Sequence, residues 1–220
     1  MTVYKSFKLR YEVCCNQGEE LVGIASRLAE LIKTGESLKF DKAASVSKVR
    51  VCNQDLIIKR FTGRSRWHSV KRLLRRSRAN NAWKASQAYS TAGIGVPEAK
   101  MYLERRLGPL RFDSYFVYQA LEGEPLLEVL PNAEGAERRA LIAQLADLFR
   151  KLRANHLVHG DMKATNLMVV KGKIFAIDLD VAGTCKFHFE KAHARDQKRF
   201  LKNWIDNEAL TTELSQHISV

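Results

Sequence analysis

The sequence predicts an α+β fold with two lobes: a small antiparallel-sheet lobe in residues 1–120 and a short, mostly helical lobe in residues 121–220. Short apolar runs that are typical of strands are concentrated before residue 121, and helical periodicity dominates after it. The segment Glu122-Gly123-Glu124-Pro125 separates the two patterns, which favours a boundary at this point. With 45% hydrophobic residues, a chain of 220 residues can bury a substantial core.

The first lobe is expected to combine helices with the sheet. Apolar residues recur at helical spacing in residues 18–34, which predicts an amphipathic helix. A second, long helix is expected at residues 66–91, where Gly93 and Pro97 beyond it stop the pattern. Short strands are expected at residues 37–40, 46–52, 55–61, 100–104 and 113–120.

The second lobe is expected to be built around a helix at residues 134–155. Its apolar stripe consists of Leu141, Leu145, Leu148 and Leu152. Two short strands, 167–170 and 173–177, follow and are joined by a turn at Lys171-Gly172. A last helix is predicted at residues 195–205.

A set of polar residues lies between and within these elements in an order that suits phosphoryl transfer. This reaction needs a lysine on the nucleotide phosphates, a carboxylate near the acceptor hydroxyl, and an Asn with a second Asp on Mg²⁺. Lys59, Asp161, Asn166 and Asp178 fit these roles in turn, and the last three lie in or after the loop His159-Gly160-Asp161-Met162-Lys163-Ala164-Thr165-Asn166. The sequence therefore predicts a kinase that uses ATP and Mg²⁺, with Asp161 as the catalytic residue and Asn166 and Asp178 as metal ligands.

Neighbouring residues extend this prediction and offer alternatives to it. Lys163 is expected to be catalytic as well, because its charge would neutralise the moving phosphoryl group. Asp180 competes with Asp178 for the metal. The alternative for His159 and Asp161 is a polar turn that caps a helix.

Several segments resemble a protein kinase-like fold and, within it, the bacterial lipopolysaccharide core kinases, the heptose and Kdo kinases of the InaA/WaaP type. The segments are SVSKVRV, LIIKRF, the basic stretch SVKRLLRRSRANNAWKASQAYSTAGIGVPEA, YFVYQALEGEPL, HGDMKATNLMV and FAIDLD, which together cover about residues 36–182. The resemblance implies transfer of phosphate from ATP to a sugar hydroxyl, of heptose or Kdo, in the lipopolysaccharide core. It also implies that Val46, Gln119 and Leu121 contact the nucleotide together with Lys59, Asn166 and Asp178.

The sequence departs from this family pattern in three respects. Residues 41–50 contain no glycine, so a phosphate cradle would have to use the backbone of Ser45 to Lys48. Ala82 precedes Trp83, where a glutamate partner for Lys59 is expected. Only 42 residues follow Asp178, too few for the peptide-binding helices of protein kinases. Two alternatives therefore remain: a kinase for a small metabolite or for protein, and a catalytically inactive kinase-like binding module.

The net charge of +13 indicates a phosphate-rich partner. Basic residues are concentrated between Lys59 and Lys84, with an apolar stripe between them, so this helix is expected to bind the anionic inner-membrane surface, and nucleic acid is the less favoured partner. No apolar run approaches the length that spans a bilayer, and the first residues lack a signal-peptide pattern. The expected location is the cytoplasm, on the inner face of the inner membrane.

Overall fold

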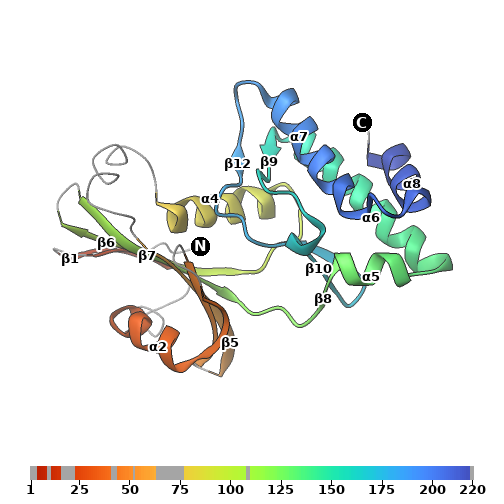
Figure 1. Cartoon of the computed structure of the whole chain (residues 1–220). Helices are drawn as coiled ribbons and strands as arrows, with labels where there is room; N and C mark the ends of the chain where they lie inside the picture. Colours follow the sequence, from red (N-terminus) through yellow and green to blue (C-terminus); the bar gives the residue numbers. More distant parts are fainter. Residues whose placement is uncertain are drawn as a thin grey trace. The chain divides into compact units, whose positions relative to one another are not determined.

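The computed structural model describes residues 4–8, 11–15, 23–40, 44–51, 53–62, 77–107 and 110–218. The chain divides into two compact units (Figure 1): residues 1–84 with 98–120, and residues 85–97 with 121–220. Helix α4 (Arg78–Thr91) starts in the first unit and ends in the second. Within the described ranges, no helix is both long and apolar enough to cross a membrane.

The first unit contains a seven-stranded antiparallel sheet in the order β1-β2-β6-β7-β5-β4-β3. Its strands are β1 (Tyr4–Lys8), β2 (Tyr11–Cys15), β3 (Glu36–Phe40), β4 (Ala44–Val51), β5 (Gln54–Phe61), β6 (Ala99–Leu107) and β7 (Leu110–Gln119). The tight connection from β4 to β5 passes through Asn53, whose φ of 57° is left-handed, a conformation that Asn adopts more readily than most residues.

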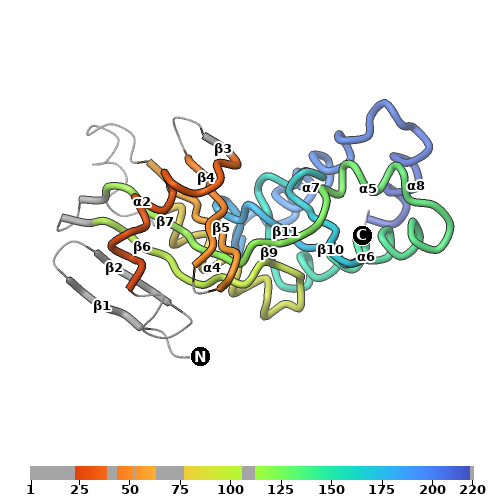
Figure 2. Tube along the Cα trace, turned by 90° about the horizontal axis from the view of Figure 1, so that it is seen from below, coloured from red at the N-terminus to blue at the C-terminus, as the bar shows by residue number. Residues whose placement is uncertain are grey.

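The two faces of this sheet carry different helices. One face carries η1 (Ile24–Arg27) and α2 (Leu28–Thr34), and Figure 2 shows α2 crossing the strands. Leu28 and Ile32 pack there in a cluster that includes Leu56 and Ile58 of β5. On the other face, the first turns of α4 pack through Trp83 against a second cluster, formed by Ala44, Phe61, Ala79, Ala82, Ala99, Tyr102 and Phe116. Because side chains alternate along a strand, β5 contributes to both clusters.

The second unit is built around α6 (Gly135–Ala154), whose predicted leucine stripe is buried. Its other helices are α5 (Leu126–Asn132), η2 (Ala164–Asn166), α7 (Phe189–Leu201), η3 (Lys202–Trp204) and α8 (Glu208–Ile218). Strands β10 (Leu167–Val170) and β11 (Lys173–Ala176) form a hairpin, which β8 (Glu124–Pro125) extends. Strands β9 (Leu157–Val158) and β12 (Gly183–Thr184) pair with each other.

The α+β class, with an antiparallel sheet in one unit and mostly helices in the other, is confirmed, and most predicted elements lie within a few residues of observed ones. The helix predicted at 66–91 is wrong as one continuous element, because Ser77 is not helical and its Oγ accepts a hydrogen bond from the backbone N–H of Asn80 at 3.0 Å, which caps α4. The helix predicted at 195–205 begins earlier, at Phe189, after His188 in the left-handed conformation. Sequence patterns did not predict β1, β2, α5, α8 or the two-residue strands.

Candidate active site

The loop of residues 159–166 is fixed to the β10–β11 hairpin at two points in the second unit. The His159 side chain is fully buried, and its Nε2 donates to the carbonyl oxygen of Ile177 at 3.1 Å. The backbone N–H of Ile177 donates to the carbonyl oxygen of Asn166 at 2.9 Å. Because Ile177 directly precedes Asp178, these hydrogen bonds fix the backbone that carries Asp178 relative to the loop that carries Asp161.

The electrostatics of His159 show that carboxylates gather around this loop. Burial lowers the pKa of His159, while the charges of Asp196, Asp178 and Asp161, together with the hydrogen bond to Ile177, raise it by less. The imidazole is therefore neutral at pH 7, in the tautomer with the proton on Nε2. Three carboxylates thus lie near enough to one buried ring to influence its charge.

Asp196 of α7 holds the start of the loop. Its carboxylate is buried and accepts the backbone N–H of His159 at 2.7 Å and that of Gly160 at 3.1 Å. Hydrogen bonds from two backbone N–H groups to one carboxylate are charge-assisted, and together they restrict the position of the loop backbone. Asp196 was not predicted from the sequence, although it shares one helical stripe with Phe189, His193 and Phe200. A charged residue on an apolar stripe is a signal of a buried polar contact.

Gly160 cannot carry a side chain in this loop. Its φ is +78°, and a Cβ built on it would lie 3.0 Å from the carbonyl oxygen of Val181. The left-handed conformation and the close approach of the neighbouring segment both require glycine. This explains the Gly in the His-Gly-Asp sequence by its local geometry.

Asp161 is in contact with two cations and one amide. Its Oδ1 accepts from Nη1 of Arg199 at 2.7 Å, and its Oδ2 accepts from Nζ of Lys163 at 3.1 Å. Nδ2 of Asn166 donates to the Asp161 carbonyl oxygen at 2.9 Å. The carboxylate is 29% exposed, so it is held from two sides while one side stays open to solvent. Arg199, which also donates to the carbonyl oxygen of Gly160 at 2.9 Å, was not predicted from the sequence.

Asp178 lies two residues after the end of β11 and has a φ of +60°. This left-handed conformation is uncommon outside glycine, although Asp and Asn tolerate it better than other residues. It turns the chain after the strand toward Leu179 and Asp180. Asp180 is buried, whereas Asp178 is half-buried.

The donor set of Asn166 and Asp178 suits a hard divalent cation. Within the described ranges, no three His, Cys, Asp or Glu side chains come together as a complete metal cage. A kinase-type site needs no such cage, because Mg²⁺ keeps water and binds phosphate oxygens alongside one or two protein ligands. The hydrogen bond from Asn166 Nδ2 leaves the amide oxygen as the atom suited to a cation.

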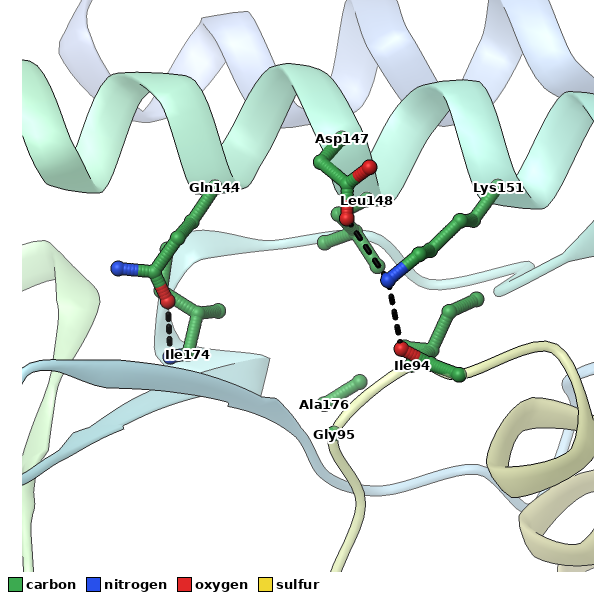
Figure 3. A pocket seen from close by; sticks show the side chains of 9 residues that line it. Ile94, Gly95, Gln144, Asp147, Leu148, Lys151, Ile174 and Ala176 are labelled. Atoms are coloured by element: carbon green, nitrogen blue, oxygen red, sulfur yellow. Dashed lines mark hydrogen bonds and ion pairs between the residues drawn. The ribbon is translucent and has the colours of Figure 1, made fainter.

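A small cavity of about 90 Å³ lies behind the hairpin, between α6 and residues 93–95 (Figure 3). Oε1 of Gln144 accepts the backbone N–H of Ile174 at 3.1 Å, and Nζ of Lys151 donates to the carbonyl oxygen of Gly93 at 2.8 Å and contacts Asp147. The backbone N–H of Ala176 donates to the carbonyl oxygen of Gly95 at 2.8 Å. These polar groups bind one another across the cavity. Their contacts hold the hairpin that leads to Asp178 against α6 and residues 93–95.

Lys59 lies in the middle of β5 in the first unit, opposite Val46 of β4 and Phe116 of β7. Its side chain is only 9% exposed, and its Nζ is 5.3 Å from the centre of the Phe61 ring. The side chain therefore belongs to the sheet face that α4 covers. A lysine buried to this extent is costly to desolvate unless a negative charge compensates it.

The carboxylate that the sequence analysis sought on α4 is absent there, because Ala82 is packed in the core beneath the helix. Glu104 of β6 is instead a buried carboxylate, 1% exposed, on the same sheet face as Lys59. The register places Glu104 opposite Ser114, which in turn pairs with Phe61. Lys100, another buried cation of this unit, has its own partner in Glu98, with Nζ and Oε2 2.6 Å apart.

The remaining predicted nucleotide residues lie in both units. Val46 is half-buried beside Lys59, Gln119 is exposed at the end of β7, and Leu121 is half-buried at the start of the second unit. The backbone of residues 45–48 pairs with β3 on one side and β5 on the other, so the predicted phosphate cradle is wrong: these amides belong to the sheet.

Most of the basic stretch lies outside the described residues, namely Arg64, Arg66, Lys71, Arg72, Arg75 and Arg76. At its edges, Arg60 binds Oδ2 of Asp113 through Nε at 3.1 Å, and the guanidinium of Arg78 lies 4.7 Å from the centre of the Phe61 ring. These two residues make contacts within the sheet unit. The predicted membrane contact of the stretch remains a prediction.

The chain is similar to known proteins in sequence and in fold. The family model described as "Lipopolysaccharide kinase (Kdo/WaaP) family" matches residues 39–218. Among solved structures, the chain is similar to "WaaP in complex with acyl carrier protein", with a TM-score of 0.68 and 16% sequence identity over 88% of this chain and 81% of that one. No curated protein sequence matches the chain.

Proposed function

Because the chain belongs to the lipopolysaccharide kinase (Kdo/WaaP) family and is therefore a phosphotransferase, we propose that it transfers the γ-phosphate of ATP to a sugar hydroxyl, of heptose or Kdo, in the lipopolysaccharide core. The observation that carries this proposal is the fixed position of Asp161. Its loop is tied to the hairpin through His159 and to α7 through Asp196. A catalytically inactive module would not need a partly exposed carboxylate held in this way.

In the proposed reaction, Asp161 orients the acceptor hydroxyl toward the γ-phosphorus and accepts its proton as the new oxygen–phosphorus bond forms. The bond from the γ-phosphorus to the β–γ bridging oxygen breaks, and ADP leaves with that oxygen. The transition state is loose, so orientation contributes more than basicity. The ion pairs with Lys163 and Arg199 fix the carboxylate rotamer, and both cations lie where they can neutralise charge on the transferred phosphoryl group. Positioning and electrostatics therefore account for most of the proposed rate enhancement.

At the nucleotide end, Lys59 is proposed to bind the phosphates, with Val46, Gln119 and Leu121 against the rest of the nucleotide. Asn166 and Asp178 would hold Mg²⁺, which neutralises phosphate charge when bound. We propose Glu104 as the carboxylate that compensates Lys59, in place of the missing acid on α4. Burial of both side chains on one sheet face supports this assignment, since a buried charge requires an opposite one nearby.

The proposed location is the cytoplasmic face of the inner membrane, where nascent lipopolysaccharide core presents anionic sugars and phosphates. The net charge of +13 supports such a glycolipid acceptor. A kinase for a small metabolite or for protein is the alternative from the same fold. The two are separated by the acceptor that receives the phosphate.

The test is transfer of label from γ-labelled ATP to purified, dephosphorylated core, comparing wild type with Asp161→Asn. The substitution preserves the shape and removes the charge, so transfer should cease while a thermal shift with Mg·ATP persists. Asp206→Asn, at an exposed aspartate remote from the loop in sequence, is the matched control and should transfer normally. Undiminished transfer by the Asp161 variant would refute the catalytic assignment, and label found only on protein would refute the sugar acceptor.

A further inference from the structure

The outer side of α7 carries a row of cations. Four exposed cations recur at intervals of four, three and four residues: Lys191, Arg195 and Lys198 of α7, and Lys202 of η3. This spacing places them on one helical face, about 16 Å long at 1.5 Å per residue. The stripe of Phe189, His193, Asp196 and Phe200 on the opposite side of the helix is buried. We call the four cations the α7 face.

Several other cations of the second unit are held in ion pairs. Arg138 binds Glu213, Lys151 binds Asp147, and Arg153 binds Glu190. Within the described part of the chain, no carboxylate lies within ion-pair distance of a cation of the α7 face. The face therefore presents uncompensated positive charge to solvent.

Large apolar side chains stand at both ends of the α7 face. Phe187 is 82% exposed and Ile205 is 73% exposed, the two highest values among the large hydrophobic residues that the structure describes. Hydrogen bonds fix the backbone next to Phe187. Sγ of Cys185 donates to the carbonyl oxygen of Phe187 at 3.0 Å, and the backbone N–H of Cys185 donates to the carbonyl oxygen of His156 at 2.8 Å. An anchored loop thus holds an aromatic ring in water.

We propose that the α7 face docks on the surface of an anionic bilayer, with Phe187 and Ile205 inserted among the lipid headgroups. Unpaired cations match the charge of the lipid phosphates, and exposed apolar residues gain by leaving water at the interface. Nucleic acid would account for the cations but not for the isoleucine, which can neither stack on a base nor bind a phosphate. The bilayer is therefore the partner that explains both observations.

This surface differs from the basic stretch of residues 64–76 and does not depend on the transfer reaction. It has a direct physical link to the loop that carries Asp161, because Asp196 and Arg199 of the same helix bind that loop. Docking of α7 would thus hold the catalytic loop at a fixed distance from the lipid surface. An acceptor sugar attached to a lipid is found at such a surface.

The test is cosedimentation of the full chain with phosphatidylglycerol-containing vesicles, without nucleotide or acceptor. The triple variant K191Q/R195Q/K198Q should bind on the order of 100-fold more weakly than wild type at low salt, since each basic residue contributes roughly fivefold. The matched control R139Q/K171Q/K173Q removes the same charge from exposed positions elsewhere in the second unit and should bind within about threefold of wild type. Equal losses in both variants would overturn the proposal, because net charge alone would then explain binding.

Insertion is tested separately with F187W. Vesicles that contain bromine-labelled lipid should quench the added tryptophan emission of F187W more than the emission of wild type, and F187S should bind more weakly at every salt concentration. If bromine-labelled lipid fails to quench the added emission of vesicle-bound F187W, the insertion of this side chain is overturned. If K191Q/R195Q/K198Q binds vesicles normally but loses affinity for a single-stranded RNA oligonucleotide, the face is a nucleic-acid surface and the proposal is wrong.

Discussion

The catalytic loop of the second unit and the Lys59 strand of the first unit hold their charged residues by different means. Hydrogen bonds with three residues determine the position of Asp161's loop: Ile177 after β11, and Asp196 and Arg199 on α7. Lys59 is buried on a sheet face that also carries the buried carboxylate Glu104. Substitutions near the loop should therefore change geometry, whereas substitutions near Lys59 should change the balance of buried charge.

The largest effects are expected at the metal and phosphate positions of the two regions. Asp178→Asn removes a proposed metal-bound charge, and turnover should fall by at least about 100-fold. Lys59→Met should lower kcat/KM for ATP by a similar amount while keeping the fold. Steady-state kinetics with Asp180→Asn as the control checks both. If Asp180→Asn is inactive and Asp178→Asn is active, the metal ligand is two residues further along the chain.

Smaller changes in kcat and KM for ATP are expected from Asp196→Asn and Glu104→Gln, and the two variants should differ in which constant changes. The first weakens a charge-assisted contact to the N–H groups of His159 and Gly160, so kcat should fall by about tenfold while KM for ATP stays unchanged. The second removes the proposed counter-charge of Lys59, so KM for ATP should change and kcat should change little. Equal effects of both variants on kcat and KM would contradict the distinction between the two regions.

The sequence predicts elements that local patterns determine. The α6 stripe of leucines follows from helical periodicity, and the β10–β11 hairpin follows from Lys171-Gly172, whose left-handed φ values of 48° and 73° form the turn. The order of Lys59, Asp161 and Asp178 likewise suffices to predict kinase chemistry. Contacts between distant segments are not visible in such patterns. Asp196 binds a backbone group 37 residues away, and nothing in its neighbours specifies that partner.

The pH dependence of stability should report the buried histidines of the second unit. Burial is the largest cause of the lowered pKa values of His159 and His193, so below the ordinary pKa of about 6.5 the unfolded chain binds more protons than the folded one. The free energy of unfolding should therefore decrease as pH falls below 6.5, by up to about 1.4 kcal/mol per pH unit for each histidine. Urea unfolding at pH 7.5, 6.0 and 5.0 measures this slope.

His193→Phe provides the control for this pH dependence. Neither ring nitrogen of His193 has a hydrogen-bond partner within the described residues, and the ring is stacked on Phe189 at 5.3 Å between centroids. Phe preserves the ring contacts and cannot be protonated. The slope between pH 6.5 and 5.0 should be shallower in the variant, and an unchanged slope would assign the pH dependence to other groups.

The smallest effect is expected at Tyr89, where α4 enters the second unit. The side chain is fully buried, and within the described residues its hydroxyl has no hydrogen-bond partner, while burial, assisted by the charge of Asp196, raises its pKa well above the ordinary value. A buried hydroxyl without a partner is destabilising, so Tyr89→Phe should increase the free energy of unfolding by about 1 kcal/mol without changing kcat. Urea unfolding at pH 7.5 measures the gain in the free energy of unfolding. In an alkaline titration followed by absorbance at 295 nm, the number of tyrosines that ionise only when the protein unfolds should be lower by one in the variant. A loss of stability in Tyr89→Phe would mean that the hydroxyl has a partner, such as an ordered water near Asp196, and that the second unit is fixed at this point by a polar contact rather than by packing.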